Sequence, residues 1–153
     1  MGVPDVAARE ADETPSGFAV PRYLTLKFDT VNARSGPADD HRVLWVYRAR
    51  GLPVQVVAET REWRQICDPE GGLAWVHRRV TDGRRSVIPL GPDPIPLRRR
   101  PRAEAEITAY LNARAIATLD RCDKGWCRLS VAGVRGWTPE TEVWGVAAPV
   151  QCR

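Results

Sequence analysis

The sequence is poor in several features that would narrow its function at once. None of its apolar runs approaches the about 18–20 residues that cross a bilayer as a helix, so no transmembrane helix is predicted. Only two histidines and one methionine occur among 153 residues, which disfavours most metal sites and many acid–base sites. Residues 1–22 lack the basic start and continuous apolar core of a signal peptide, so either the protein stays in the cytoplasm or a leader has been removed.

Long helices are also disfavoured, because 13 prolines and 12 glycines are spread along the chain. Hydrophobic residues make up 43% and charged residues 27%, as in globular domains. Short runs rich in Val, Leu, Ile, Trp and Tyr alternate with turn residues, which indicates an all-β fold of the small-barrel or sandwich type. Strands are expected near residues 23–28, 43–48, 53–59, 63–68 and 73–77, and again near 95–98, 107–111, 115–121, 126–132 and 135–138.

The chain contains an internal repeat. Arg34 corresponds to Arg98, Trp63 to Trp126 and Trp75 to Trp137, with offsets of 64, 63 and 62 residues that shorten as two loop deletions would require. The chain is therefore expected to hold two copies of an all-β unit of about 60 residues. Residues 103–117 have the Ala, Glu and Leu content of a helix, but they align with a pair of strands in the first copy, so strand is predicted there.

The first copy contains the motifs VNARSGP at 31–37, GLPVQV at 51–56, EWRQI at 62–66 and AWV at 74–76. In this order, the motifs resemble a bacterial SH3 domain. The second copy resembles the same pattern less fully: its opening, PLRRRP at 96–101, lacks the Asn and Gly, whereas GWCRL at 125–129 and GW at 136–137 match well. The tandem arrangement is similar to exported proteobacterial SH3 proteins of uncharacterised role.

The repeat and the resemblance together predict two tandem small SH3-like five-stranded barrels with a flexible N-terminal tail. The expected parts are a tail at 1–22, a first barrel at 23–82, a Pro-rich basic linker at 83–94, a second barrel at 95–147 and a C-terminal tail at 148–153. The resemblance also implies a role as an accessory binding module, often beside cell-wall enzymes, with some members recognising peptidoglycan peptides.

The four cysteines, Cys67, Cys122, Cys127 and Cys152, allow three pairings. Cys122 and Cys127 flank a four-residue hairpin loop and align with Glu59 and Arg64, an opposite-charge pair, so a disulfide is predicted between them. Cys67 and Cys152 are the second candidate pair, with two free thiols as the alternative. Disulfides would place the protein in an oxidising compartment, periplasmic or secreted, whereas reduced cysteines would indicate the cytoplasm.

No catalytic motif is recognised. A Cys67–His77 dyad has no supporting motif, and no G-x-x-x-x-G-K-[ST] phosphate loop or G-x-S-x-G sequence occurs. We therefore assign no catalytic residue, metal or cofactor, and after two barrels and a tail no room is expected for a catalytic domain.

Aromatic side chains and the repeated arginine are the candidates for a ligand groove. Exposed aromatic patches mark binding sites, although core or rim filling is the alternative for several of these rings. Arg98 has a further alternative, which is to hold an opening loop through hydrogen bonds from its guanidinium. The groove candidates are Arg34, Trp45, Tyr47, Trp63, Trp75, Arg98, Tyr110, Trp126 and Trp137.

The charge is concentrated between the two copies. The chain has 21 arginines against 2 lysines and a net charge of +4, yet residues 78–102 alone hold eight arginines against two aspartates. A basic patch is therefore predicted at Arg84, Arg85, Arg99, Arg100 and Arg102. It suits an anionic partner, with simple solubility as the alternative; nucleic acid is disfavoured because no nucleic-acid motif is recognised.

The sequence therefore favours a non-catalytic binding module for a peptide or a cell-envelope polymer of the peptidoglycan type. The basic patch makes an anionic ligand one of the candidates. A structural adaptor between proteins, or an accessory to a cell-wall hydrolase supplied by another chain, is the alternative. The identity of the ligand and the oligomeric state do not follow from the sequence.

Overall fold

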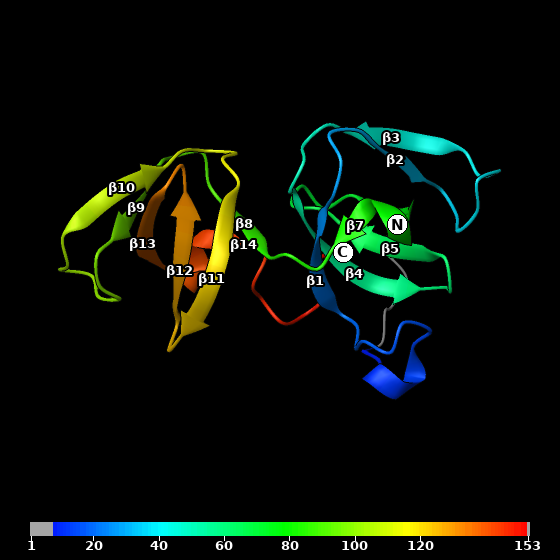
Figure 1. Cartoon of the computed structure of the whole chain (residues 1–153), viewed down its shortest axis with the longest axis horizontal. Helices are drawn as coiled ribbons and strands as arrows, with labels where there is room; N and C mark the ends of the chain where they lie inside the picture. The colour runs from blue at the N-terminus through cyan, green and yellow to red at the C-terminus, as the bar shows by residue number, and fades with distance from the viewer. Residues whose placement is uncertain (1–7, 153) are drawn as a thin grey trace. The chain divides into compact units, whose positions relative to one another are not determined.

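The computed structural model describes residues 8–152, which form an all-β protein of two compact domains (Figure 1). The described residues up to Arg84, together with those from Ala148 onward, form the first domain, and Arg85–Ala147 form the second. None of the helical segments among the described residues is long and apolar enough to cross a membrane.

The first domain is a seven-stranded antiparallel sheet with the strand order β3-β2-β6-β5-β4-β1-β7. Two 3-10 helices accompany the strands, η1 at Ala11–Glu13 and η2 at Arg78–Val80. The strands are β1 Arg22–Leu26, β2 Val31–Arg34, β3 Val43–Tyr47, β4 Pro53–Glu59, β5 Trp63–Cys67, β6 Leu73–His77 and β7 Thr81–Asp82.

The second domain repeats this plan, with the order β10-β9-β13-β12-β11-β8-β14. Each strand takes the place of the strand seven positions earlier, and the 3-10 helix η3, Glu140–Glu142, takes the place of η2. The strands are β8 Ser86–Pro89, β9 Ile95–Arg98, β10 Ile107–Leu111, β11 Ala117–Asp123, β12 Trp126–Val131, β13 Val134–Pro139 and β14 Val143–Trp144.

The predicted repeat is confirmed down to the pairing register. Arg34 pairs with Trp75 between β2 and β6, and Arg98 pairs with Trp137 between β9 and β13. Residues 107–111, where composition alone suited a helix, form the strand β10 on the edge of the second sheet. Pairing with β9 therefore overrides the local helix propensity.

Each sheet has seven strands where five were expected. The additional elements are short, since β7 and β14 are two residues long, and β2 and β8 had not been expected as strands. β8 lies inside the range 83–94 that was expected to be a linker, and it pairs with β11 and β14. The reason is packing: Val87 on β8 is completely buried and completes the second core.

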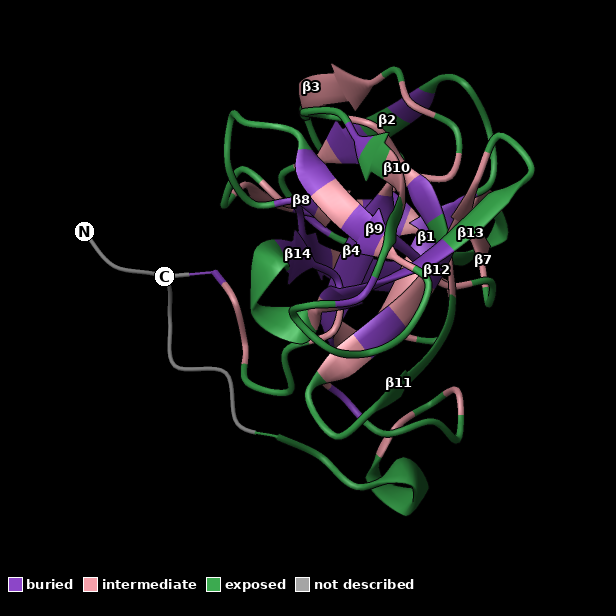
Figure 2. Ribbon diagram, turned by 90° about the vertical axis from the view of Figure 1, so that its left-hand side faces the viewer, coloured by how far each residue is buried: buried purple, intermediate pink, exposed green. Residues whose placement is uncertain are grey.

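Each domain has its own hydrophobic core. Alternate residues of the strands point inward, as in β9, where buried Ile95 and Leu97 alternate with half-buried Pro96 and Arg98 (Figure 2). The first core contains Leu26, Val31, Ala33, Val54, Val56, Ile66, Ala74 and Val76. The second contains Val87, Ile95, Leu97, Leu111, Ala117, Leu129 and Val143.

Both expected tails have ordered contacts where the structure describes them. Arg9 and Val20 exchange two backbone hydrogen bonds, and the Ser16 amide donates to the Glu59 carboxylate at 2.9 Å. The C-terminal residues 148–152 pack on the first domain. The remainder of the N-terminal tail, residues 1–7, lies outside the described residues.

Candidate ligand-binding site

The four cysteines form two disulfides. Cys122 and Cys127 are cross-strand partners in β11 and β12, with 4.0 Å between their Cα atoms. Cys67 in β5 is joined to Cys152, with 5.7 Å between their Cα atoms. Both bridges lie within single domains, so each ties a domain to itself rather than to the other.

The first domain has an ion pair where the second has its hairpin disulfide. Glu59 and Arg64 are cross-strand partners, and the Arg64 Nε lies 3.3 Å from a Glu59 carboxylate oxygen that also accepts from Arg22 at 2.9 Å. The Glu59 side chain is only 1% exposed. Burial raises the pKa of Glu59, but hydrogen bonds from Ser16 and Arg22 outweigh it, so the pKa lies below its ordinary value.

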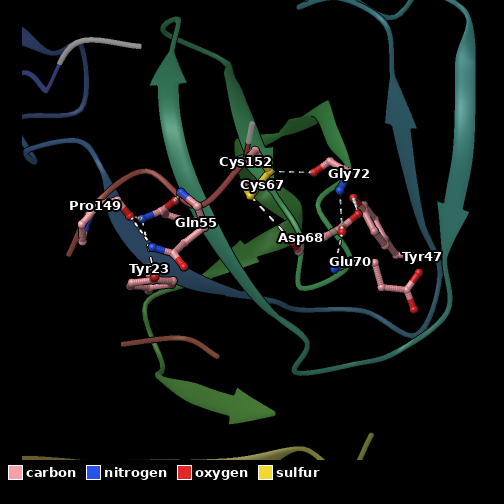
Figure 3. The surroundings of a disulfide bond; sticks show 10 residues. Tyr23, Tyr47, Gln55, Cys67, Asp68, Glu70, Gly72, Pro149 and Cys152 are labelled. Carbon is pink, nitrogen blue, oxygen red and sulfur yellow. Dashed lines mark hydrogen bonds between the residues drawn. A yellow bond between two sulfur atoms is a disulfide. The ribbon is translucent and has the colours of Figure 1, made fainter. Parts of the chain in front are cut away.

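The Cys67–Cys152 bond fixes the C-terminal tail onto the first domain (Figure 3). The buried side-chain amide of Gln55 donates to the Pro149 carbonyl at 2.8 Å and accepts from the Gln151 backbone N–H at 2.9 Å. Gln55 is the cross-strand neighbour of Cys67, so one covalent bond and two hydrogen bonds hold the tail over adjacent positions of β4 and β5.

The repeated arginines hold the loops that follow β2 and β9. The Arg34 guanidinium donates to the carbonyls of Asp39 and His41, each at 3.0 Å, and the Arg98 guanidinium donates to the Ala105 carbonyl at 2.9 Å. The alternative suggested for Arg98, a loop-holding role, is therefore present in both copies.

Trp45 and Tyr47, the aromatic pair of β3, are joined to the turn after β5. Their rings meet edge to face at 6.3 Å, and the Tyr47 hydroxyl donates to the Asp68 carboxylate at 2.7 Å. Asp68 also accepts from the backbone N–H groups of Glu70 and Gly72. Burial and the nearby Asp68 carboxylate raise the pKa of Tyr47 far above its ordinary value, so the phenol stays neutral and serves as a hydrogen-bond donor.

The two tryptophans at the hairpin differ between the copies. Trp63 is buried and its ring packs edge-on against His77 at 5.3 Å between centroids. Its counterpart Trp126 is half-buried and lines a pocket of about 380 Å³ within the second domain.

The pocket at Trp126 combines apolar walls with polar groups. Arg98, Asp93 and Glu142 supply charges of both signs, and Thr138 has a buried hydroxyl without a hydrogen-bond partner among the described residues. The full lining comprises Gly91, Asp93, Pro94, Ile95, Pro96, Arg98, Ala103, Trp126, Thr138, Pro139 and Glu142. We call this cavity the Trp126 pocket.

A larger groove, of about 760 Å³, contains Trp137. The Arg121 guanidinium stacks over the Trp137 ring, 5.3 Å from its centroid. The remaining lining includes Pro101, Thr108, Asp123 and residues 133–136. Because its lining contains Arg99, Arg100, Arg121, Arg128 and Arg135, we call it the arginine groove.

The predicted basic patch is divided among different surroundings. Arg99 and Arg100 line the arginine groove, whereas Arg85 is half-buried and donates to the Gly145 carbonyl at 2.7 Å. Arg84 is exposed in the first domain beside Asp82, and Arg102 lies 3.7 Å from the Glu104 carboxylate.

Among the remaining aromatic candidates, Trp75 is half-buried, and Tyr110 is 58% exposed and lines neither cavity.

Three arginines of the groove were not among the sequence candidates. Arg121, Arg128 and Arg135 come from three different strands and are brought together only by the sheet. Aligning the two copies could have singled them out, since Ala58, Gln65 and Leu73 stand at the same places in the first domain.

The fold defines a protein built from two small β-domains of the SH3 type in succession along the chain. The family described as the bacterial SH3 domain matches residues 27–83 and 91–145, most of the chain and both copies. The chain therefore belongs to the bacterial SH3 domain family.

Comparison with curated proteins gives no significant match. The solved structures that resemble the chain include two from Trichomonas vaginalis. NlpC2 has 14% identity, 81% of this chain covered and a TM-score of 0.38, and NlpC1 has 14% identity, 82% of this chain covered and a TM-score of 0.38. The chain spans 48% and 46% of the length of those two proteins.

Proposed function

We propose that the chain is a non-catalytic binding module for a peptide or a cell-envelope polymer of the peptidoglycan type. Its membership of the bacterial SH3 family supports a cell-wall-related binding role. The single observation that supports a ligand site most is the Trp126 pocket, a cavity of about 380 Å³ beside a half-buried indole, whereas the ring of its counterpart, Trp63, is buried.

The chemistry of the Trp126 pocket suits a peptide that carries both charges. Pro94, Pro96 and Pro139 give rigid apolar walls beside the indole, a surface against which aliphatic parts of a peptide can pack. The charges of the lining residues would let Arg98 pair with a ligand carboxylate, and Asp93 and Glu142 with ligand ammonium groups. Cell-wall stem peptides carry both kinds of group, which favours them over a uniformly charged polymer at this pocket.

The two disulfides favour a periplasmic or secreted location. A reducing cytoplasm keeps thiols reduced, so disulfides persist mainly in oxidising compartments. In this chain both bridges lie within folded domains, one of them between cross-strand neighbours. An oxidising location also brings the protein to the cell envelope, where the proposed ligand is found.

The test is a titration of the purified chain with soluble peptidoglycan fragments, followed by NMR shifts or tryptophan fluorescence. Replacing Trp126 by Ala should weaken binding at least about tenfold, since aromatic anchors in pockets carry much of a binding energy. Tyr110→Ala is the matched control, because this ring is exposed and lies outside both cavities.

Equal loss of binding in both variants would mean that the pocket is not the site. Absence of binding to every fragment by the folded, oxidised protein would count against a peptidoglycan ligand and favour the alternative, an adaptor between proteins.

A further inference from the structure

Each domain has an equivalent outer sheet face, and the surroundings of this face differ between the two domains. On β4, β5 and β6 this face is formed by residues that alternate with the core. One row across the strands is Leu73–Cys67–Gln55, and the next is Trp75–Gln65–Ala58. In the second domain the same rows are Arg135–Ser130–Thr118 and Trp137–Arg128–Arg121.

In the first domain this face carries a peptide already, the chain's own C-terminal tail. Cys152 is bonded to Cys67, and both hydrogen-bonding ends of the Gln55 amide engage the tail backbone at Pro149 and Gln151. Cys67 and Gln55 are completely buried. The fold thus holds a polypeptide segment on this face.

In the second domain the face is open and basic. Thr118, the counterpart of Gln55, is exposed, and the arginine groove of about 760 Å³ lies over the neighbouring row. All five arginines of the groove stand where the first domain has uncharged residues. The uncharged counterparts are Ser35, Gly36, Ala58, Gln65 and Leu73.

Two of the five guanidiniums already bind carboxylates of this chain. Arg99 donates to Glu106 and Arg128 donates to Asp120, both at 3.1 Å. These pairs display the interaction that the groove offers, because the planar guanidinium matches the geometry of a carboxylate.

The other three arginines form no ion pair with an acidic side chain within residues 8–152. Arg100 and Arg135 are exposed, with no side-chain ion pair or hydrogen bond to any described residue, and Arg121 contacts the Trp137 ring. Asp123 is the one carboxylate that lines the groove itself. The arginines therefore leave an excess of positive charge for an incoming ligand.

We propose that the arginine groove of the second domain binds an extended acidic peptide. The polypeptide nature of the occupant follows from the tail on the equivalent face of the first domain, and its acidity follows from the five arginines that replace uncharged residues. Side chains of an extended peptide recur on one side about every 6.8 Å, so acidic residues at alternate positions can reach successive guanidiniums. This site is separate from the Trp126 pocket and adds a second ligand class to the proposed function.

The test is a fluorescence-anisotropy titration of the oxidised full chain with a labelled peptide that has glutamate at alternate positions. The same peptide with glutamine in place of glutamate is the probe control. We expect binding of the acidic peptide only, and a clear loss of affinity when salt rises from about 0.05 M to about 0.3 M, because exposed charges are then screened.

The decisive variant is Arg100→Gln with Arg121→Gln and Arg135→Gln, which should lower the affinity about tenfold at low salt and flatten the salt dependence. The matched control removes three exposed arginines of the first domain, Arg42, Arg48 and Arg61, each replaced by Gln. The control loses the same charge as the groove variant but keeps the arginine groove intact, so it should bind within about twofold of the wild type. The triple variant also removes the Arg121–Trp137 stack, and this loss could disturb the fold. The double variant Arg100→Gln with Arg135→Gln keeps the stack and should still weaken binding.

Equal weakening in the groove variant and its control would reduce the effect to net charge and overturn the proposal. Stronger groove-dependent binding of polyphosphate or single-stranded DNA than of the acidic peptide would overturn the peptide assignment, as would no binding of the peptide at all. Titration of the same variants with peptidoglycan fragments distinguishes failure of the groove proposal from failure of the proposed function. If the Trp126 pocket binds no fragment, the result for the acidic peptide in the groove is unchanged.

Discussion

Removing the Cys67–Cys152 bridge should destabilise the first domain strongly. In the chain-entropy description, a cross-link stabilises a fold by an amount that grows with the logarithm of the loop it closes. The two cysteines are 85 residues apart, which corresponds to about 4.6 kcal/mol. If the second domain stays folded while the first unfolds, it acts as a short spacer, and roughly 25 flexible residues give about 3.5 kcal/mol.

The variant is Cys67→Ala with Cys152→Ala, compared with the oxidised wild type by thermal unfolding and by hydrogen exchange of the β4 and β5 amides. A loss of about 3.5 kcal/mol should lower the midpoint of the first domain by roughly 15 °C. The amides of Gln151 and its neighbours should exchange freely, because the Gln55 hydrogen bonds alone would have to order the tail.

Mild reduction of the wild-type protein supplies a second perturbation that leaves the Cys67 side chain in place. It should lower the midpoint in the same way, which separates the cross-link from any cavity left by alanine. A midpoint that moves by less than about 2 °C in both experiments would refute the assignment of this stability to the bridge.

Three further predictions follow from the same contacts. Cys122→Ala with Cys127→Ala should cost about 2 kcal/mol in the second domain and leave β4 and β5 exchange unchanged, since the bridge closes a loop with a separation of only five residues; unchanged stability in guanidinium unfolding would contradict it. The folded pKa of Glu59 is depressed, so its contribution to stability is present above the unfolded pKa and lost as pH falls through the folded pKa. Glu59→Gln should therefore remove about 3 kcal/mol at neutral pH and reduce the loss of stability on acidification. Denaturant midpoints measured from neutral to acidic pH check both effects. Arg34→Gln should loosen residues 38–41 and cost about 2 kcal/mol, because two charge-assisted hydrogen bonds are lost; hydrogen exchange in that loop is the measurement, and an unaltered pattern would exclude the loop-holding role.

Much of the fold follows from the sequence because the repeat constrains it twice. Residues 107–111 could be assigned to a strand against their helical composition only through the alignment with the first copy. β2 and β8 escaped the strand assignment for local reasons: β2 carries the family's opening motif, and β8 lies among prolines that favour a linker. What decides β8 is the burial of Val87, a tertiary contact that no local pattern contains.

The candidate sites divide in the same way. The Cys122–Cys127 bridge could be predicted because it joins neighbours across one hairpin and has a charged pair as its counterpart. The arginine groove could not be predicted from the dense run at 98–102 alone, since its other members stand on β11, β12 and β13. Side chains on separate strands become one surface only when register is known.

The two copies show how one sheet can be stabilised and used differently at equivalent positions. Where the first domain has the buried Glu59–Arg64 pair, the second has a disulfide, and both join the same two strand positions across the hairpin. The outer face differs in the same manner. The first domain covers it with a tail that its own Cys67 holds, whereas the second leaves it open beside arginines. A free peptide can therefore compete for this face only in the second domain, which is where the charge for recognising it is found.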